Sequence, residues 1–204
     1  MIFDMASLTS TEKYRLLTSC IVPRPIAWVS SISGDNIPNI APFSYFTGVS
    51  IEPPLVLFAV ERRKNVKKDT LRNIEETKEF VIHLVTEMNV SEMNLTSQDY
   101  SPDVNEIEIA GLTMIPSTTL KVPSIKESPL RLECVLHEVH EIGSSPHSLI
   151  IGEVKTAVVN DEVVEDGKIM MDRLQAVGRM GGRWYTKTGE LFELPRLDWR
   201  KSEM

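Results

Sequence analysis

The chain has 204 residues, of which 42% are hydrophobic and 25% are charged, as is typical of a globular domain. Its net charge of −7 argues against general binding to nucleic acids or anionic membranes, and no apolar stretch is long enough to span a bilayer. We therefore expect one domain over residues 1–204 and, since the first residues lack a signal-peptide pattern, a soluble cytoplasmic protein. The distant Cys20 and Cys134 are expected to be a buried pair of reduced thiols.

The first third of the chain predicts three strands. Residues 26–32 are rich in β-branched and aromatic side chains and end at a turn cluster over 33–36. An extended pattern resumes at 39–46, so these two segments are expected to pair as a hairpin. Residues 55–60 form a continuous apolar run, and we expect this third strand to be buried on both faces.

The middle of the chain combines helices, one strand and an irregular stretch. Asp69 has the position of an N-cap for a helix over 70–78, and a strand is predicted at 80–85. Thr86 is expected to cap a short helix. Residues 97–129 contain many Pro, Ser and Thr residues, and we expect them to pack around the core without forming it.

A long hairpin is predicted next. Apolar and polar residues alternate over 130–136, residues 143–147 form a turn, and 149–159 return. Beyond them, 161–168 is a charged turn and 178–182 a glycine-rich loop. Because hairpin-length turns dominate and no alternating βαβ pattern occurs, we predict a mainly β protein with a few α-helices, built as an antiparallel barrel.

A basic segment precedes the predicted helix at 70–78. It contains Arg62, Arg63, Lys64, Lys67 and Lys68. Main-chain N–H groups at a helix N-terminus bind phosphate well when Lys or Arg side chains lie nearby, and Thr70 adds a hydroxyl in the first turn. The alternative is a solvated charged loop followed by an ordinary Asp69 cap.

Small polar residues at the ends of the first two strands suggest a site for a flat ligand with a polar edge, for which a flavin is our first choice. Trp28 and Ser30 share one strand face and could offer an aromatic wall and a hydrogen-bonding group, whereas Ser31 points the other way. The alternative is a core tryptophan followed by two strand-end serines. The same two interpretations apply to the segment around Pro42, which contains Asn39, Ala41 and Ser44.

The histidines divide into two groups. Cys134, His137 and His140 have a spacing that would place metal ligands on one helix face, but their segment alternates like a strand, so we expect surface histidines and no metal site. His147 occupies the predicted hairpin turn, where it could contact a ligand or donate a proton. A solvent-exposed turn residue is the alternative for His147.

Several standard signatures are missing from the sequence. No GxGxxG, Walker or GxSxG pattern occurs, so nothing indicates a Rossmann, P-loop or hydrolase site. The loop GRMGGRWY has glycines that permit close main-chain approach, and Arg179, Arg183 and Tyr185 could anchor a ligand.

Taken together, the segments make the chain resemble the flavin reductase-like family of FMN-binding split-barrel proteins. The matching segments are RPIAWVSS at 24–31, NIAPFSYF at 39–46, EPPLVLF at 52–58, KKDTLRNI at 67–74, ESPLRLEC at 127–134, HSLIIGEV at 147–154 and VGRMGGRWY at 177–185. They follow the family's order and cover nearly the whole chain.

The resemblance implies a Greek-key split barrel that dimerises, with FMN in a groove near the subunit interface. It places one group of residues along the flavin ring or its ribityl chain: Trp28, Ser30, Ser31, Asn39, Ala41 and Ser44. It places Lys68, Asp69 and Thr70 around the phosphate, and Arg179, Gly181 and Tyr185 on a loop that approaches from the C-terminal side. Relatives that use nicotinamide donors often carry Gly-Asp-His before the last long strand, whereas this chain has Ser145-Pro146-His147.

The leading functional hypothesis is thus an FMN-dependent oxidoreductase of the NAD(P)H:flavin reductase type, with NADH or NADPH as electron donor and His147 as the one candidate acid or base. The altered turn at Pro146 leaves open an FMN-binding electron carrier or sensor, similar to flavoredoxin, that has no direct nicotinamide activity. A split-barrel module for haem is the third alternative, for which no His or Cys is obviously placed as an axial ligand.

Overall fold

The computed structural model describes residues 1–62, 66–144 and 146–195. Arg63 and Lys64 of the basic segment, and Ser145 of the altered turn, lie outside the described residues. The helices are α1 (Ser10–Cys20), α2 (Asp69–Thr77), α3 (Val90–Leu95), α4 (Glu106–Ile109), α5 (Met171–Leu174) and the 3-10 helix η1 (Asp161–Val163). The strands of the main sheet are β1 (Ala27–Ile32), β2 (Pro38–Phe43), β3 (Phe46–Ile51), β4 (Pro54–Glu61), β5 (Glu79–Leu84), β8 (Leu130–Ile142) and β9 (His147–Val159). Three short pairs complete the fold: β6 (Met114–Ile115) with β7 (Ser124–Ile125), β10 (Val164–Glu165) with β11 (Lys168–Ile169), and β12 (Val177–Arg179) with β13 (Tyr185–Lys187).

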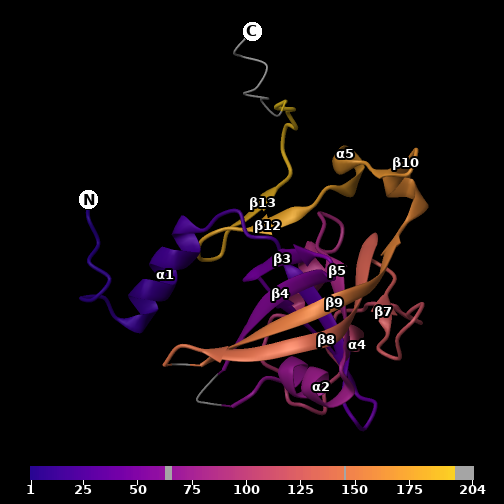
Figure 1. Cartoon of the computed structure of the whole chain (residues 1–204), viewed down its shortest axis with the longest axis horizontal. Helices are drawn as coiled ribbons and strands as arrows, with labels where there is room; N and C mark the ends of the chain where they lie inside the picture. The colour runs from indigo at the N-terminus through magenta and orange to yellow at the C-terminus, as the bar shows by residue number, and fades with distance from the viewer. Residues whose placement is uncertain (63–65, 145, 196–204) are drawn as a thin grey trace.

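The main sheet has seven strands in the order β2-β1-β5-β8-β9-β4-β3, and every neighbouring pair is antiparallel. Its two edge strands, β2 and β3, are consecutive in the chain and are separated only by Ser44 and Tyr45. The Ala59 N–H of β4 donates to the Tyr45 carbonyl (2.9 Å). This bond attaches the turn that follows β2 to β4, which lies near the other end of the strand order from β2. The sheet is therefore a barrel that is split between β2 and β3 (Figure 1), and the predicted mainly β, antiparallel split-barrel fold is confirmed.

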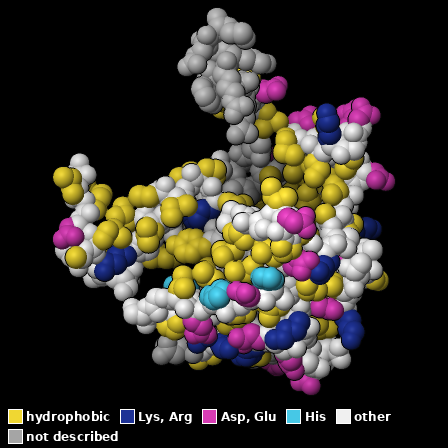
Figure 2. All heavy atoms as spheres, viewed as in Figure 1, with side chains coloured by type: hydrophobic (Ala, Val, Ile, Leu, Met, Phe, Trp, Pro, Cys, Tyr) yellow, Lys and Arg dark blue, Asp and Glu magenta, His cyan; other side chains and the backbone are white. Residues whose placement is uncertain are grey.

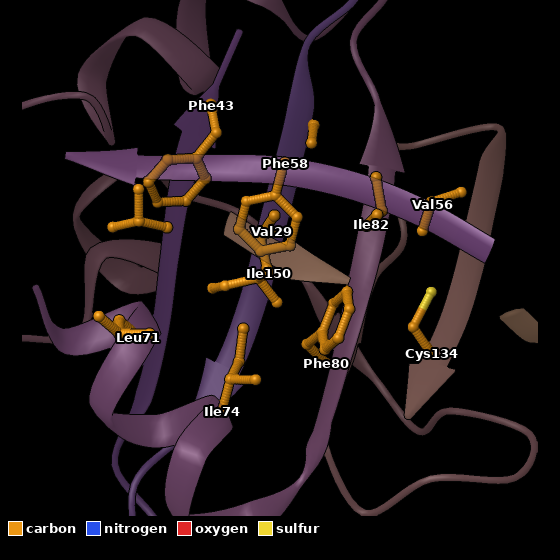
Figure 3. Close-up of a cluster of buried hydrophobic side chains, with 12 residues drawn as sticks. Val29, Phe43, Val56, Phe58, Leu71, Ile74, Phe80, Ile82, Cys134 and Ile150 are labelled. Atoms are coloured by element: carbon orange, nitrogen blue, oxygen red, sulfur yellow. The ribbon is translucent and has the colours of Figure 1, made fainter. Parts of the chain in front are cut away.

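The core consists of two clusters on the two faces of the sheet. Inside the barrel, Phe58 packs edge-on against Phe80 with ring centroids 5.6 Å apart, and α2 closes this cluster with Leu71 and Ile74 (Figure 3). On the other face, Trp28 packs within a second cluster that includes residues of α3 and α4. Two clusters form because successive side chains of a strand point to opposite faces.

Both predicted helix caps are wrong by one to three residues. The N-cap of α2 is Lys68, and Asp69 lies in the first turn, where its carboxylate still faces the positive end of the helix dipole. The N-cap of α3 is Asn89, whose Oδ1 accepts from the Thr86 N–H (2.8 Å). Thr86 thus precedes the helix and does not cap it.

Burial differs from the expectation at β4 and at Cys20. Val56, Phe58 and Val60 of β4 are buried, but the residues between them are only half-buried, because only one face of this strand meets the barrel interior. Cys20 is exposed at the end of α1, whereas Cys134 is buried in β8, so the expected buried pair of thiols is wrong, although both cysteines are free. Burial raises the pKa of the Cys134 thiol.

The predicted long hairpin is confirmed as β8 and β9, with two irregularities in its register. His147 does not lie in the turn but begins β9, where it pairs with Glu61 of β4. The register shifts between Leu136 and Glu138, so His137 is the extra residue of a β-bulge.

Helix α1 was not predicted. It begins at a capping box in which the Thr9 hydroxyl accepts from the Glu12 N–H (3.3 Å) and the Glu12 carboxylate accepts from the Thr9 N–H (2.8 Å). The helix lies at the periphery, to the left of the barrel in Figure 1, while the last described residues extend away from the body at the top.

Among the described residues, no helix has the length and apolar character needed to cross a membrane.

Candidate functional site

Three connected cavities surround Pro42 at the split between β2 and β3. They have volumes of about 90, 410 and 140 Å³, and Pro42 lines all of them. Lys68, Ser44 and Ser97 each line two of the three, so the cavities form one continuous depression. We call this depression the Pro42 groove. Its walls come from α1, the β2–β3 turn, the start of α2, the segment after α3 and the β12–β13 hairpin.

One end of the groove is the N-terminus of α2. Lys68, Asp69 and Thr70 line the cavity there, and the main-chain N–H groups of the first helical turn have no partner within the helix. Asp69 pairs with Arg72, one turn further along the helix. Thr70 is 1% exposed and its hydroxyl donates to Asn39 Oδ1 (2.8 Å), so that proton is already used within the protein. An anion at this end would therefore meet main-chain N–H groups and Lys68 rather than the Thr70 proton.

A buried hydrogen-bond network lies beneath this end of the groove. Asn39 Nδ2 donates to Glu106 Oε1 (2.8 Å), and Asn39 Oδ1 also accepts from the Ser31 hydroxyl (3.3 Å), which in turn accepts from Asn73 Nδ2 (3.1 Å). The other Glu106 oxygen accepts from the Ile40 N–H (3.3 Å). Burial raises the pKa of Glu106, although these hydrogen bonds favour its charged form. Both ends of the Asn39 amide are thus occupied, and its role is to fix the position of Thr70 at the start of α2.

The structure places Trp28, Ser30 and Ser31 in the interior and not on the groove. All three are 0% exposed. Trp28 Nε1 donates to Thr96 Oγ1 (2.9 Å), and the Ser30 hydroxyl donates to the Pro123 carbonyl (2.8 Å). Thr96 is one of the groove's lining residues, so the buried Trp28 side chain supports the groove wall through this hydrogen bond.

The centre of the groove is the β2–β3 turn. Ser44 lines two of the cavities, and its Oγ accepts from Arg24 Nε (3.4 Å), which leaves the hydroxyl proton able to point outward. His147 lines the same cavity as Ser44 and Lys68, so the long hairpin brings it to the groove although it is not a turn residue. Burial raises the pKa of the neighbouring Tyr45. Ala41 lines the cavity on the α2 side.

The C-terminal side of the groove is built around two arginines. The Arg179 guanidinium lies 4.4 Å from the centroid of the Tyr185 ring, and it donates to the Tyr185 hydroxyl and to the Gly182 carbonyl (2.6 Å). Arg24 is 5% exposed, and its guanidinium donates to carbonyls at the end of α1 and to the Met180 carbonyl (3.1 Å). This buried arginine therefore holds α1 and the β12–β13 hairpin against the β2–β3 turn.

Gly181 lies beside the groove rather than in it. It lines an adjacent cavity of about 720 Å³ between α1 and the hairpin. A Cβ at this position would come within 2.6 Å of Ser19 Oγ, so a residue without a side chain is needed where the hairpin turn meets the helix.

Sequence reasoning missed three contributions to the groove. Arg24 belongs to a recognised segment but was given no role, since nothing local shows that its side chain joins three distant parts of the chain. Tyr14 and Thr18 line the groove from α1, whose capping box was the available signal. Ser97 opens the stretch that we expected to be irregular packing.

The strand histidines lie on the surface, as expected. The side chains of His137 and His140 are 40% and 55% exposed, and His140 Nε2 lies 2.6 Å from a Glu138 carboxylate oxygen. Within the described part of the chain, no group of three or more His, Cys, Asp or Glu residues is arranged to hold a metal ion.

The fold and the groove define the class of the protein, a split barrel with a polar groove at the split. The family model described as "Flavin reductase like domain" matches residues 18–176, and the chain belongs to this family. An uncharacterized protein of Halalkalibacterium halodurans is 42% identical over 195 residues, which are 93% of each chain.

Solved structures agree with this assignment. Nitrilotriacetate monooxygenase component B from Bacillus cereus has 39% identity and a TM-score of 0.92, with 95% of this chain and 98% of that chain covered. The 2-nitrobenzoate 2-nitroreductase of Pseudomonas fluorescens has 32% identity and a TM-score of 0.90, with 98% of each chain covered. Membership of the family indicates an oxidoreductase that works with a flavin.

Proposed function

We propose that the protein is an FMN-binding oxidoreductase of the NAD(P)H:flavin reductase type. The observation that carries the proposal is that one continuous groove brings the α2 N-terminus, Ser44, His147 and the Arg179–Tyr185 pair together around Pro42. These groups come from segments far apart in the sequence. Two similar structures are named as a monooxygenase component and a nitroreductase, which supports a redox role.

The donors present in the groove suit a flavin mononucleotide. We place the phosphate at the start of α2, where main-chain N–H groups without a partner in the helix and Lys68 would bind it. We place the ring near Ala41 and Ser44, where the Ser44 hydroxyl would donate to a polar ring edge. Bound FMN would supply the hydride and electron chemistry, and the chain's part would be binding, orientation and electrostatics.

The absorbance spectrum of the purified protein, before and after addition of FMN, tests this proposal directly. Absence of bound flavin together with no binding of added FMN would refute it. The phosphate position has its own test, in which Lys68→Ala should weaken FMN binding more than riboflavin binding. Lys78→Ala, at the opposite end of α2, is the matched control and should leave both affinities unchanged. Equal losses for FMN and riboflavin would place the phosphate elsewhere.

The second candidate is an FMN-binding electron carrier or sensor without direct nicotinamide activity. The Pro146-His147 sequence motivates it, because His147 stands at the groove but the turn before it differs from that of relatives that use nicotinamide donors. Anaerobic mixing of the FMN-loaded protein with NADH and with NADPH separates the two candidates. Rapid bleaching of the flavin absorbance would exclude the carrier-only function.

We also propose that the protein is a cytoplasmic homodimer. Ile51 at the end of edge strand β3 is 91% exposed, Trp184 is 76% exposed, and Leu17 on α1 is 44% exposed. Figure 2 shows hydrophobic side chains gathered on α1 and on the adjoining face of the barrel. Ile51→Lys should lower the molar mass measured by light scattering from dimer to monomer. A wild-type protein that remains monomeric at high micromolar concentration would refute the dimer.

A further inference from the structure

The largest cavity of the Pro42 groove has a marked charge imbalance. Its volume is about 410 Å³, and the described residues that line it include Arg15, Arg24 and Arg179 but no Asp or Glu. The cavity at the start of α2 has a mixed charge, because its lining includes Lys68 beside Asp69, Asp99 and Glu106. Although the chain has a net charge of −7, cations line this cavity of about 410 Å³. The local electrostatic potential is therefore positive and attracts anions.

Arg24 contributes a buried charge to this cavity. The acceptors of its hydrogen bonds are the carbonyls of Thr18, Ile21 and Met180 and the hydroxyl of Ser44, all of which are uncharged. These dipoles hold the guanidinium in place without neutralising it. A buried charge that is solvated only by dipoles is stabilised further when an opposite charge binds beside it.

Arg179 supplies directed donors to the same cavity. Stacking on Tyr185 and the hydrogen bond to the Gly182 carbonyl fix the plane of the Arg179 guanidinium, and a fixed guanidinium pairs well with carboxylate or phosphate oxygens. The Tyr185 hydroxyl in turn donates to Asn94 Oδ1 (3.3 Å), which helps to fix the position of the tyrosine ring.

We propose that this cavity binds an anionic group, a carboxylate or a pyrophosphate, of the second reactant that exchanges electrons with the flavin. The inference rests on the proposed function, since it takes the rest of the groove to be the flavin site. Pro42, Ser44 and Ser97 are shared between this cavity and the others, so a molecule anchored here would lie against whatever occupies the rest of the groove. The volume is within the range of cavities that take small organic ligands.

The test is a calorimetric titration of the FMN-loaded protein with pyrophosphate and with benzoate, and benzamide serves as the uncharged counterpart of benzoate. Arg179→Met should weaken binding of the anion at least about tenfold, because a charge-assisted pair is lost. Arg15→Met should weaken it by a smaller factor, since Arg15 is on the surface of α1 and is replaceable without loss of a core contact. Lys13→Met removes a charge from the same helix outside the cavity and should leave the affinity unchanged.

Preference for pyrophosphate would identify a phosphate-bearing donor such as a nicotinamide dinucleotide, and preference for benzoate would identify an aromatic acid. Either supports the proposal, provided that benzamide binds more weakly than benzoate. Failure of both anions to bind, or equal affinities in wild type, Arg179→Met and Arg15→Met, would overturn it.

The flavin-free protein is titrated in parallel. If FMN and pyrophosphate compete and Arg179→Met weakens the binding of both, the cavity holds the flavin's own phosphate, and its assignment to a second reactant is wrong. A chain that binds no FMN would refute the proposed function, whereas the titration of the flavin-free protein would still decide whether the cavity binds anions.

Discussion

His83 is predicted to make the stability of the protein depend steeply on pH below neutrality. It lies in β5 and is 0% exposed. Its Nε2 accepts from the Ile125 N–H (3.1 Å), and its Nδ1 lies 3.0 Å from the Trp28 carbonyl. An accepting Nε2 and a donating Nδ1–H define a neutral ring, and protonation would turn the acceptor into a donor that faces the Ile125 N–H. Burial lowers the pKa of His83 from 6.5 to about 3.

The sign of the effect follows from comparing the two states. In the unfolded chain the ring binds a proton near pH 6.5, whereas in the folded protein it stays neutral down to about pH 3. The stabilising contribution of the neutral ring is therefore fully present above pH 6.5 and is lost as the pH falls from 6.5 towards 3. One proton taken up on unfolding gives a slope of up to about 1.4 kcal/mol per pH unit, so His83 should account for a loss of about 2 kcal/mol between pH 7.5 and 5.

The assay is urea denaturation at pH 7.5 and at pH 5, with wild type compared to His83→Asn. Asparagine keeps a donor for the Trp28 carbonyl but does not titrate, and loss of the acceptor for the Ile125 N–H should cost about 1–3 kcal/mol at pH 7.5. The wild type should then lose about 2 kcal/mol more than the variant on acidification. His140→Asn, at an exposed position, is the control that should keep the wild-type pH dependence. An identical loss in wild type and His83→Asn would refute the reasoning.

Two further predictions concern the barrel. Gly152→Ala would place a Cβ within 2.2 Å of Phe80 Cζ in the packed interior, so calorimetry should show a free energy of unfolding lower by about 1–3 kcal/mol, and an unchanged melting temperature would contradict this. The Glu133 carboxylate accepts from the main-chain N–H groups of Thr118 (2.6 Å) and Thr119 (2.8 Å). Burial acts to raise its pKa, but the hydrogen bond from the Thr119 hydroxyl (2.6 Å) and the two main-chain hydrogen bonds outweigh burial and leave the pKa lowered. Glu133→Gln cannot accept at both positions and should destabilise the protein by about 1–3 kcal/mol in urea denaturation, an effect that should shrink as the pH falls below 4.5.

Most strands of the main sheet were predictable from the sequence because their signals are local, but β3 was not predicted. The β8–β9 hairpin shows alternating polarity, and the turn between β1 and β2 shows its turn residues, so neither needs knowledge of the rest of the fold. Predicting the burial of Trp28, Ser30 and Ser31 would have required knowledge of the rest of the fold. β1 lies between β2 and β5, and its two faces are covered by different segments, so no periodicity shows that Ser30 meets Pro123 and that Ser31 meets Asn39.

The groove could be anticipated only in part for the same reason. The N-terminus of α2 carries its own signal, and the structure places Lys68, Asp69 and Thr70 together as expected. Arg24 differs, because its partners Thr18, Ser44 and Met180 come from three elements that meet only after folding. A long-range contact made by one flexible side chain leaves no periodic trace in the sequence.

The position of the groove follows from the way in which the barrel fails to close. β2 contains Pro38 and Pro42, which lack the N–H needed for a second ladder, and β3 has a register shift between Gly48 and Ser50. The two edge strands therefore have no partner in the described sheet on their outer sides, and side chains of α1, the α2 N-terminus and the β12–β13 hairpin line the space at the turn between them. A closed barrel would have sealed that space with main-chain hydrogen bonds. Because the prolines keep it open, polar and cationic groups from distant segments can meet there, and the same irregularity that splits the barrel creates the Pro42 groove.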